Sequence, residues 1–457
     1  MVVEDYAAEG KSLARVDGKV IFIENAIPGD VVDVQLHKNK KDWAEGFPVC
    51  FKKRSADRIE AFCKHFGICG GCQWQTLPYE KQLIYKQKQV ADNLQRIGKT
   101  ALPEILPIIG CGDTTLYRNK LEYTFSNKKY LTNAELHDTS VSTYMDVAGF
   151  HAKGMFDKVV EIDICHLQEE PTNLIRKAIA RFGVENKIPF YDMRLHTGWL
   201  RTMQVRTATT GELMVNIMLG YKDEENTKKL LDSLLKDFPG ITSLLYTINT
   251  KFNDSWYDLE PIIYFGKGFI LEKLEDFKFK ISPKSFFQTN TKQSENLYRV
   301  AREFAQLNGT QNVYDLYCGT GSIGIFASKH AKKIIGIEVI KDAVKDAEEN
   351  ARLNNIEHAS FFAGDVIDIC TDQFFHTHGR PDVIITDPPR AGMHEKLARK
   401  LLDIAAPLIV YVSCNTATQA RDINLLSERY SVEKIQPVDM FPHTHHIENV
   451  VQLKLKN

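Results

Sequence analysis

From about residue 281 the chain alternates short apolar strands with helical segments, and this alternation constrains the fold more than any other feature. The apolar runs lie at 312–316, 333–337, 359–363, 383–386 and 408–413. Strands that alternate with helices form parallel sheets, whose ligands bind beyond the carboxyl ends of the strands. We therefore expect a doubly wound parallel sheet of the α/β class over residues 281–457.

Two regions with a different pattern precede this sheet. Residues 1–55 alternate β-rich runs at 19–24, 31–36 and 47–52 with turn signals such as Asp17-Gly18, which is typical of a small OB-like barrel. Residues 56–280 mix strands and helices, and we interpret them as a central α+β domain. Its expected helices lie at 78–97, 171–182 and 224–238, and its expected strands at 213–218 and 243–248.

Composition excludes several classes of protein. The net charge of −1 argues neither for nor against the binding of nucleic acid. No apolar run approaches the roughly 20 residues that span a bilayer. The N-terminus is polar and does not resemble a signal peptide, so we expect a cytoplasmic protein without a membrane partner. The 9 cysteines are then better explained by metal binding or catalysis than by disulfides.

A glycine-rich loop follows the strand at 312–316. Gly319, Gly321 and Gly324 match G-x-G-x-x-G, a pattern that dinucleotide enzymes share. Asp315 before the loop could meet a cationic ligand better than a pyrophosphate, and Glu338 ends the next strand, where it could bind ribose hydroxyls. These carboxylates favour S-adenosylmethionine, although Glu338 could also be a solvated strand end.

Two more strands end in residues suited to chemistry. The strand at 383–386 leads into Asp387-Pro-Pro-Arg390, a rigid loop whose carboxylate can project over the cofactor. The strand at 408–413 leads into Cys414, which we interpret as a nucleophile. A buried packing cysteine is the alternative, because free Cys is among the most buried residue types.

A second group of cysteines lies in the central region. Cys63, Cys69 and Cys72 are spaced C-x5-C-x2-C among glycines, and a fourth ligand would complete a zinc or four-iron site. We expect Cys50, Cys111, Cys318 and Cys370 to be packing residues. His443, His445 and His446 are expected to be loop residues that could line the active site.

Together these motifs resemble the S-adenosylmethionine-dependent RNA uracil-5-methyltransferase family, in its branch with a TRAM domain and an iron–sulfur cluster that acts on 23S ribosomal RNA. The resemblance spans the chain and rests on four segments: AEGKSLARVDGKVIFIENAIPGD near the N-terminus, SFFQTN at 285–290, DLYCGTG at 315–321 and SCN at 413–415. It implies a Rossmann-like methyltransferase domain behind an N-terminal TRAM barrel.

The resemblance also implies the roles of single residues. It implies Cys414 as the nucleophile and Glu448, in HHIENVV, as the base; the implied cofactor contacts are Gln288, Tyr317, Glu338 and Asp387. It assigns Cys165 as the fourth ligand beside Cys63, Cys69 and Cys72, and hence a [4Fe-4S] cluster, with zinc as the alternative. Partly by resemblance, the segment 117–120 (YRNK) is a candidate phosphate contact, with a solvated charge run as the equal alternative.

We therefore expect a monomeric methyltransferase that forms 5-methyluridine in ribosomal RNA. The same chemistry on transfer RNA is the first alternative; the cysteine group and the TRAM module argue against it, since the transfer-RNA branch is expected to be shorter and to lack both. An NAD-linked iron–sulfur oxidoreductase is the alternative from another class, and an RNA-binding assembly factor with an inactive methyltransferase domain is a third.

Overall fold

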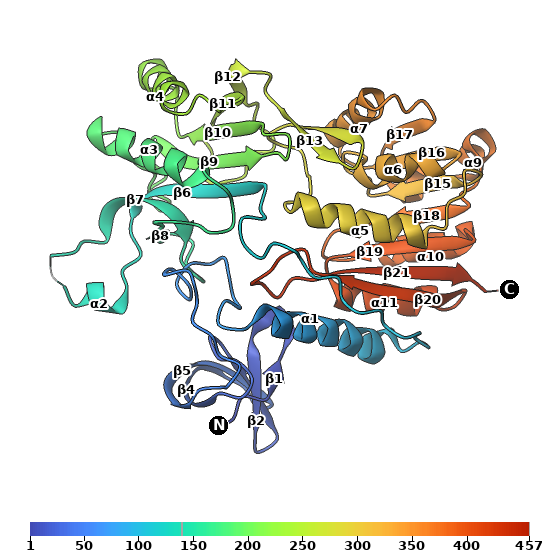
Figure 1. Ribbon diagram of the computed structural model, residues 1–457, viewed down its shortest axis with the longest axis horizontal. Helices are drawn as coiled ribbons and strands as arrows, with labels where there is room; N and C mark the ends of the chain where they lie inside the picture. Colours follow the sequence, from blue (N-terminus) through green and yellow to red (C-terminus); the bar gives the residue numbers. More distant parts are fainter. Residues whose placement is uncertain (139, 457) are drawn as a thin grey trace.

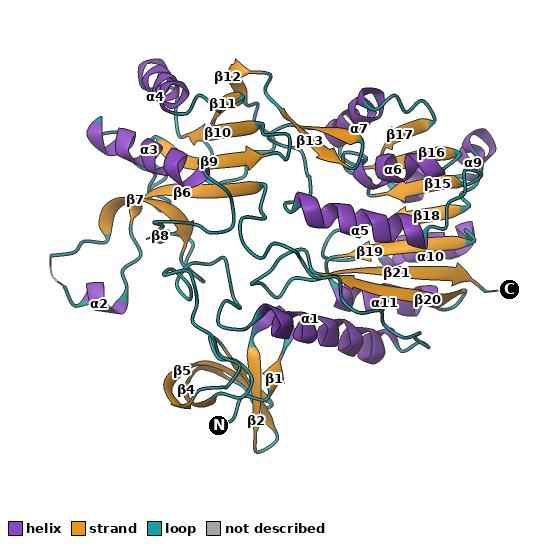
Figure 2. Cartoon of the chain, in the orientation of Figure 1, coloured by secondary structure: helices purple, strands orange, loops and turns teal. Residues whose placement is uncertain are grey.

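The computed structural model describes residues 1–138 and 140–456, within which the strands form four sheets (Figure 1). Figure 2 shows a mixed α/β protein in which helices cover the two large sheets. In the described part of the chain no helix is long and apolar enough to cross a membrane.

The first sheet lies at the N-terminus and has the strand order β1-β2-β3-β5-β4. Its strands are β1 (Asp5–Tyr6), β2 (Ser12–Val16), β3 (Lys19–Ile23), β4 (Val31–Asn39) and β5 (Trp43–Lys53). The three predicted strands are confirmed as β3, β4 and β5. A bridge between Val2 and Val31 brings the chain before β1 to β4, so the two ends of this sheet approach each other.

Helix α1 (Tyr79–Asn93) continues into a π-helical turn at Leu94–Gly98 and ends at Lys99, whose φ of 47° is left-handed. This confirms the helix predicted at 78–97. Val90 and Leu94 are fully buried in the core of the C-terminal sheet, and Figure 1 shows α1 between that sheet and the N-terminal strands. The helix is therefore anchored to the C-terminal sheet although the two lie far apart in sequence.

The central sheet has seven described strands in the order β12-β11-β10-β9-β6-β7-β8. They are β6 (Lys120–Lys128), β7 (Tyr144–His151), β8 (Val159–Glu161), β9 (Leu200–Thr207), β10 (Leu213–Leu219), β11 (Ser243–Ile248) and β12 (Ile262–Gly266). The helices here are α2 (Asn133–Leu136), α3 (Thr172–Glu185) and α4 (Glu224–Asp237). Ile175 of α3 and Leu230 of α4 pack on Val205 of β9, so these helices share one core with the sheet.

A hairpin and a helix lead into the C-terminal sheet. The hairpin pairs β13 (Ile270–Leu274) with β14 (Phe277–Ile281), and α5 (Thr291–Phe304) follows it. Asn290 caps α5, because its side chain accepts a hydrogen bond from the N–H of Gln293 at 3.2 Å. Phe279 and Leu297 join the core of the C-terminal sheet.

The C-terminal sheet has the order β17-β16-β15-β18-β19-β21-β20. The strands are β15 (Asn312–Leu316), β16 (Lys333–Glu338), β17 (Ala359–Ala363), β18 (Val383–Thr386), β19 (Leu408–Ser413), β20 (Tyr430–Val438) and β21 (Glu448–Leu455). The helices are α6 (Ser322–Ala327), α7 (Lys341–Leu353), α8 (Val366–Ile369), α9 (Asp372–His378), α10 (Glu395–Ile404) and α11 (Thr416–Leu426).

The five predicted strands of this sheet are confirmed and pair in parallel. The sheet also contains an antiparallel pair that the strand–helix pattern did not predict, because β21 runs antiparallel between β19 and β20. Polar residues in both strands, and their direct connection by the loop at 439–447, hid this pair from the pattern. The pairing matters for function, since it sets Glu448 directly beside the end of β19.

Candidate functional site

The glycine-rich loop connects β15 to α6 at the carboxyl end of the sheet. Gly319 and Gly321 have left-handed φ values of 54° and 77°, which favour glycine. A Cβ at Gly319 would meet no atom within 4 Å, whereas one at Gly324 would lie 2.9 Å from the Asp315 carboxylate. The loop thus leaves open space at Gly319 and requires close packing at Gly324, a cradle that fits the methionine end of a nucleotide ligand.

Two of the predicted cofactor contacts belong to this loop or bond to it. Glu338, at the end of β16, accepts hydrogen bonds from the N–H groups of Gly319 at 3.2 Å and Ile340 at 3.0 Å. Tyr317 is half-buried and has a left-handed φ of 59°, which is strained for a non-glycine residue. Asp365 caps α8 by accepting from the N–H of Ile367 at 2.8 Å, and its charge contributes to raising the pKa of Tyr317.

Cys414 follows β19 and is half-buried. The next residue, Asn415, caps α11 by accepting from the N–H groups of Ala417 and Thr418 at 3.1 and 3.4 Å. Burial, and after it the Glu448 and Asp387 carboxylates, raise the pKa of the Cys414 thiol to about 12 against the opposing effect of Arg390. The nucleophile candidate is therefore a protonated thiol next to two carboxyl groups at pH 7.

Three carboxyl groups lie close to one another at this edge of the sheet. Burial raises the pKa of Asp315 and of Asp387 to about 7, and it raises that of Glu448 well above its usual range. Asp387 acts electrostatically on both of the others, and Asp315 also accepts from the N–H of Gly324 at 2.8 Å. Buried acids without a cation remain partly protonated near neutral pH, as is common in sites that bind a cation or move a proton.

Gln288 lies before α5 and is 7% exposed. Its carbonyl accepts from the amide of Asn119 at 2.8 Å, and Asn290 donates to the Met440 carbonyl at 3.0 Å. The segment that carries Gln288 is thus held between β6 and the loop at 439–446, which leads to Glu448.

Arg390 received no individual role from the sequence, although it belongs to the Asp-Pro-Pro-Arg loop. It is exposed, and its carbonyl accepts from the side chains of Asn415 at 3.0 Å and Thr418 at 3.2 Å. Its guanidinium lowers the pKa of both Cys414 and Glu448. The motif could have suggested this role, because its loop and the Cys414 loop follow neighbouring parallel strands.

The four predicted metal ligands, Cys63, Cys69, Cys72 and Cys165, line one pocket of about 520 Å³. Burial raises the pKa of Cys69 to about 12 and that of Cys72 to about 11, and the four thiols act electrostatically on one another. Arg118, which also lines this pocket, lowers the pKa of Cys72 and Cys165. We refer to this place as the cysteine pocket.

As a donor set, four thiols beside a cation suit a metal centre with thiolate ligands. In the described residues, however, no group of three or more His, Cys, Asp or Glu side chains is arranged to hold a metal ion. The four predicted ligands thus line one pocket, while their arrangement around a shared metal stays a prediction.

Hydrogen bonds connect the cysteine pocket to the loop before Glu448. The N–H groups of Gln73 and Trp74 donate to the His443 carbonyl at 2.8 and 3.0 Å. The Gln73 side chain accepts from the N–H of His445 at 3.3 Å and bonds its ring, and Thr444 lines the cysteine pocket. The chain directly after Cys72 therefore holds the chain directly before Glu448.

The three histidines lie in this loop, where His443 is buried and His445 and His446 are half-buried. Burial lowers the pKa of His443 and His445 to about 4 and that of His446 to about 3, so all three are neutral at pH 7. His443 donates from its N–H to Gln82 of α1 at 2.8 Å. They shape the loop beside Glu448.

The remaining cysteines differ from one another. Cys318 and Cys370 are buried, which confirms them as packing residues, and Cys111 is half-buried with its thiol donating to the Asp439 carbonyl at 3.0 Å. The prediction is wrong for Cys50, which is exposed on β5. Its strand presents alternate faces to solvent, and the sequence did not reveal which face Cys50 occupies.

The segment at 117–120 is not a solvated charge run. Tyr117 is 8% exposed and donates to the Pro442 carbonyl at 3.1 Å. Arg118 and Lys120 line the cysteine pocket, and the Arg118 guanidinium lies 5.6 Å from the Phe441 ring. The solvated alternative is therefore wrong, while contact with phosphate stays a prediction.

Comparisons with known proteins agree with this geometry. Residues 261–456 match the family model described as tRNA (uracil-5-)-methyltransferase, and residues 2–49 match the TRAM domain. An uncharacterized RNA methyltransferase of Bacteroides thetaiotaomicron is 51% identical over 98% of this chain and 100% of its own length. A second one, from Porphyromonas gingivalis, is 49% identical over 99% of each chain.

Among solved structures, the Pyrococcus abyssi tRNA (uracil-54, C5)-methyltransferase in complex with S-adenosyl-L-homocysteine has a TM-score of 0.76 and 27% identity. The match covers 99% of this chain and 99% of that one. The expectation that transfer-RNA enzymes of this kind are shorter is therefore wrong for this structure. Chain length does not separate ribosomal from transfer RNA as a substrate.

Proposed function

Because the chain belongs to the RNA uracil-5-methyltransferase family with a TRAM domain, and is thus an S-adenosylmethionine-dependent RNA methyltransferase, we propose that it forms 5-methyluridine through a covalent bond between Cys414 and uracil C6. The observation that carries this proposal is a thiol at the end of β19 beside the carboxyl groups of Asp387 and Glu448. The names of the matching relatives give no support to the oxidoreductase alternative.

The first step needs a nucleophile because C5 of uracil is a poor carbon nucleophile. When the Cys414 thiolate adds to C6, electron density moves to C5, which can then accept a methyl group. Since the thiol is protonated in the free enzyme, its proton must leave as it attacks. A carboxylate next to the thiol can take this proton, and the Arg390 guanidinium favours the thiolate.

The last step removes the C5 proton so that the sulfur can be eliminated. We assign this step to Glu448, which is 4% exposed and begins β21 beside the end of β19. Glu448 must be ionised to accept this proton, which the Arg390 cation favours, and its raised pKa then makes the carboxylate a stronger base; cysteine is a workable leaving group. The uracil ring then carries a methyl group at C5 and is no longer bonded to the enzyme through C6. The Cys414 sulfur leaves as a thiolate and regains its proton.

S-adenosylmethionine supplies the methyl group when it is bound. We propose that Gln288, Tyr317, Glu338 and Asp387 hold it, with the backbone of Gly319 and Gly321 close to the ligand. The open space at Gly319 and the anionic lining from Asp315 and Asp387 support this assignment, because the methyl donor is a cation.

Labelled methyl transfer and a fluorinated substrate test the mechanism. In RNA with 5-fluorouridine at the target, the C5 fluorine cannot be removed as a proton, so the protein and the methylated RNA stay covalently joined. The adduct should form with the native protein and be absent in a Cys414→Ala variant. Normal methylation by that variant would overturn the proposal.

For the substrate we propose 23S ribosomal RNA, based on the motif resemblance and the four cysteines, with the protein acting as a cytoplasmic monomer. Transfer RNA is the second candidate, favoured by the match to the Pyrococcus abyssi enzyme over 99% of both chains. Methylation of purified ribosomal and transfer RNA with labelled cofactor, followed by mapping of 5-methyluridine, decides between them.

We further propose that the cysteine pocket holds a [4Fe-4S] cluster on Cys63, Cys69, Cys72 and Cys165, with zinc as the alternative. The support is that these thiols line one pocket, which Arg118 makes more favourable for thiolates. No step of methyl transfer is assigned to the cluster. Iron, sulfide and zinc analysis of protein purified without oxygen tests this assignment.

A further inference from the structure

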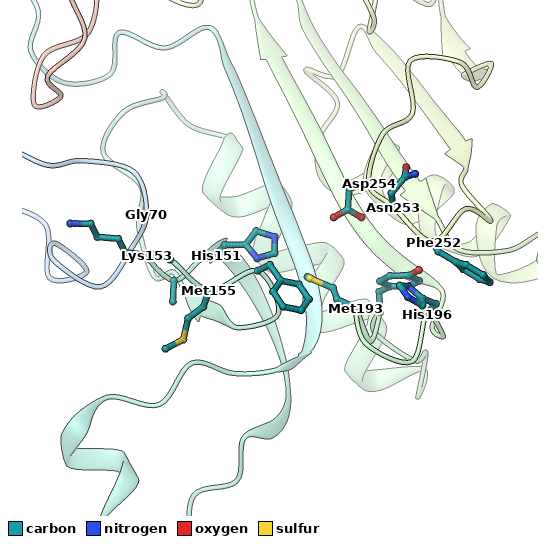
Figure 3. Close-up of a pocket in the computed structure, with 13 residues that line it drawn as sticks. Gly70, His151, Lys153, Met155, Met193, His196, Phe252, Asn253 and Asp254 are labelled. Carbon is teal, nitrogen blue, oxygen red and sulfur yellow. The ribbon is translucent and has the colours of Figure 1, made fainter. Parts of the chain in front are cut away.

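A second pocket, of about 670 Å³, opens on the central sheet next to the cysteine pocket (Figure 3). Its walls come from the turn after β7, the turn at 191–196 and the loop at 252–254. Gly70 and His151 line both pockets, and the Gly70 N–H donates to the His151 carbonyl at 3.1 Å. None of the residues assigned to methyl transfer lines it.

Large aromatic side chains stand exposed at this pocket. Phe252 is 76% exposed and its ring stacks on His196, with centroids 4.8 Å apart and planes at 27°. Phe156 is 68% exposed and has the Arg194 guanidinium 5.5 Å from its ring. Figure 3 shows Phe252 and His196 together on one side and His151 on the other. Flat rings that remain in contact with water are surfaces on which a planar ligand can stack.

The walls are fixed before any ligand arrives. Arg201, which is 2% exposed, donates to the carbonyls of Asn249, Lys251 and Asn253 at 2.6, 2.8 and 2.9 Å and to the Asp254 carboxylate at 2.9 Å. Opposite this loop, the Asp192 carboxylate accepts from two N–H groups of the turn that carries His196, at 2.9 and 3.0 Å. A pocket held this rigidly loses little entropy when a ligand binds.

The pocket also carries polar groups of a particular kind. The Asp254 side chain is half exposed and can accept hydrogen bonds from an amino group. Lys153 lines the pocket and pairs with Glu24 at the surface, whereas Arg194 pairs with the buried Asp157 carboxylate. The surface pair is weak, so a phosphate can replace Glu24 at Lys153.

We propose that this pocket, which we call the base pocket, binds one unpaired nucleobase with an exocyclic amino group from the RNA substrate, at a second position besides the reacting uridine. The inference rests on RNA being the substrate. The base pocket adjoins the cysteine pocket through Gly70 and His151, and Thr444 of the cysteine pocket lies four residues before Glu448 (448 − 444). In this proposal an RNA strand whose uridine reaches Cys414 runs past the cysteine pocket, and one of its other bases reaches Phe252.

Binding of labelled RNA without cofactor tests the proposal, so that a failure of methylation does not obscure the result. Phe252→Ala and Phe156→Ala should each weaken binding roughly 5- to 150-fold, the loss expected from about 1–3 kcal/mol of stacking per base. KM should rise with kcat unchanged. Phe265→Ala is the matched control, since Phe265 is 47% exposed on β12 at the far edge of the sheet and should bind like the native protein.

An abasic scan separates a base pocket from a general loss of affinity. In the native protein, one abasic position other than the target should weaken binding, and Phe252→Ala should be insensitive at that same position. Replacing that base by uracil should weaken binding in the native protein and less so in Asp254→Asn. Native-like binding by Phe252→Ala, or equal losses at every scanned position, would overturn the proposal. Unchanged melting temperatures show that the variants are folded.

Discussion

The proposed catalytic site and the cysteine pocket both hold protonated thiols, yet the charged side chains near these thiols differ. The pKa of Cys414 is raised to about 12 and that of Cys72 to about 11, mainly by burial. The carboxyl groups of Glu448 and Asp387 add to the rise at Cys414 and outweigh Arg390, whereas the other thiols and the Arg118 cation act on Cys72 and Cys165. Carboxyl groups thus oppose ionisation of Cys414, while a cation favours ionisation of the thiols in the cysteine pocket.

This difference agrees with the two proposed tasks. A nucleophile that must form and break a carbon–sulfur bond in each cycle should not be a permanent thiolate, because a thiolate also reacts with metals and oxidants. Metal ligands must be thiolates, and a cation nearby compensates their charge. Four changes test how far the contrast holds.

The largest effect is expected for Cys414→Ser. A hydroxyl is a much weaker nucleophile and leaving group, so methyl transfer should fall by roughly 10⁴-fold or more, as for other covalent catalysts. Metal content should be unchanged. Loss of metal together with activity would show that the two groups of thiols are not separate.

The converse change is Cys72→Ser. If four ligands share the roughly 10–16 kcal/mol of a structural metal site, loss of one should cost about 3–4 kcal/mol of metal binding. Metal analysis and thermal melting measure this, and labelling of Cys414 with iodoacetamide should continue. Cys50→Ser is the control, because Cys50 is exposed on β5 and should change none of these quantities.

Asp387→Asn tests the carboxyl groups near Cys414 through the pH dependence of the free energy of unfolding. A carboxyl whose pKa rises from 3.8 to about 7 on folding binds more protons in the folded state, so its contribution to stability is lost as pH rises through about 7. Between pH 5 and pH 8 the stability of the variant relative to the native protein should therefore rise by about 2–3 kcal/mol. Denaturant unfolding of ligand-free protein at both pH values measures this. A difference that is equal at pH 5 and pH 8 would contradict the raised pKa.

The smallest effect concerns the link between the two regions. Gln73→Leu removes the side-chain hydrogen bonds to His445, so Glu448 should be held less well and kcat should fall about tenfold, the size of one hydrogen bond. Metal content should stay normal. If Glu448 removes the C5 proton, the covalent adduct should accumulate even with ordinary uridine. Gln373→Leu on α9 is the matched control. Accumulation of the covalent adduct in this control variant would argue against the link.

The sequence predicted those parts of the fold whose residues are close together in the chain. The five parallel strands were found because each is a continuous apolar run between a glycine-rich or polar loop and a helix. β20 and β21 were missed, since both mix polar and apolar residues and a loop at 439–447 joins them without the helix that separates the parallel strands. Cys50 was placed inside because a strand pattern does not tell which of its faces meets solvent.

The residues of the candidate site can also be divided into those that the strand pattern predicted and those that it did not. Loops after neighbouring parallel strands must meet, so Cys414 after β19 and Asp387 after β18 could be expected near each other from the order of strands alone. Glu448 and Gln288 came only from the motif resemblance. The base pocket could not be foreseen, because His151, His196 and Phe252 belong to three separated segments and none of them has a recognisable motif.

One buried contact limits how this protein can be taken apart. Lys86 of α1 and Asp439, 353 positions later, form an ion pair of 2.6 Å in which both side chains are fully buried. Leaving one such charge without its partner costs about 3–5 kcal/mol. Cutting the chain at residue 281 to obtain a minimal methyltransferase would therefore leave an uncompensated aspartate beneath the loop that leads to Glu448. Fusions and truncations of this enzyme should keep α1 with the C-terminal sheet, even though the cut falls between regions that look separable in sequence.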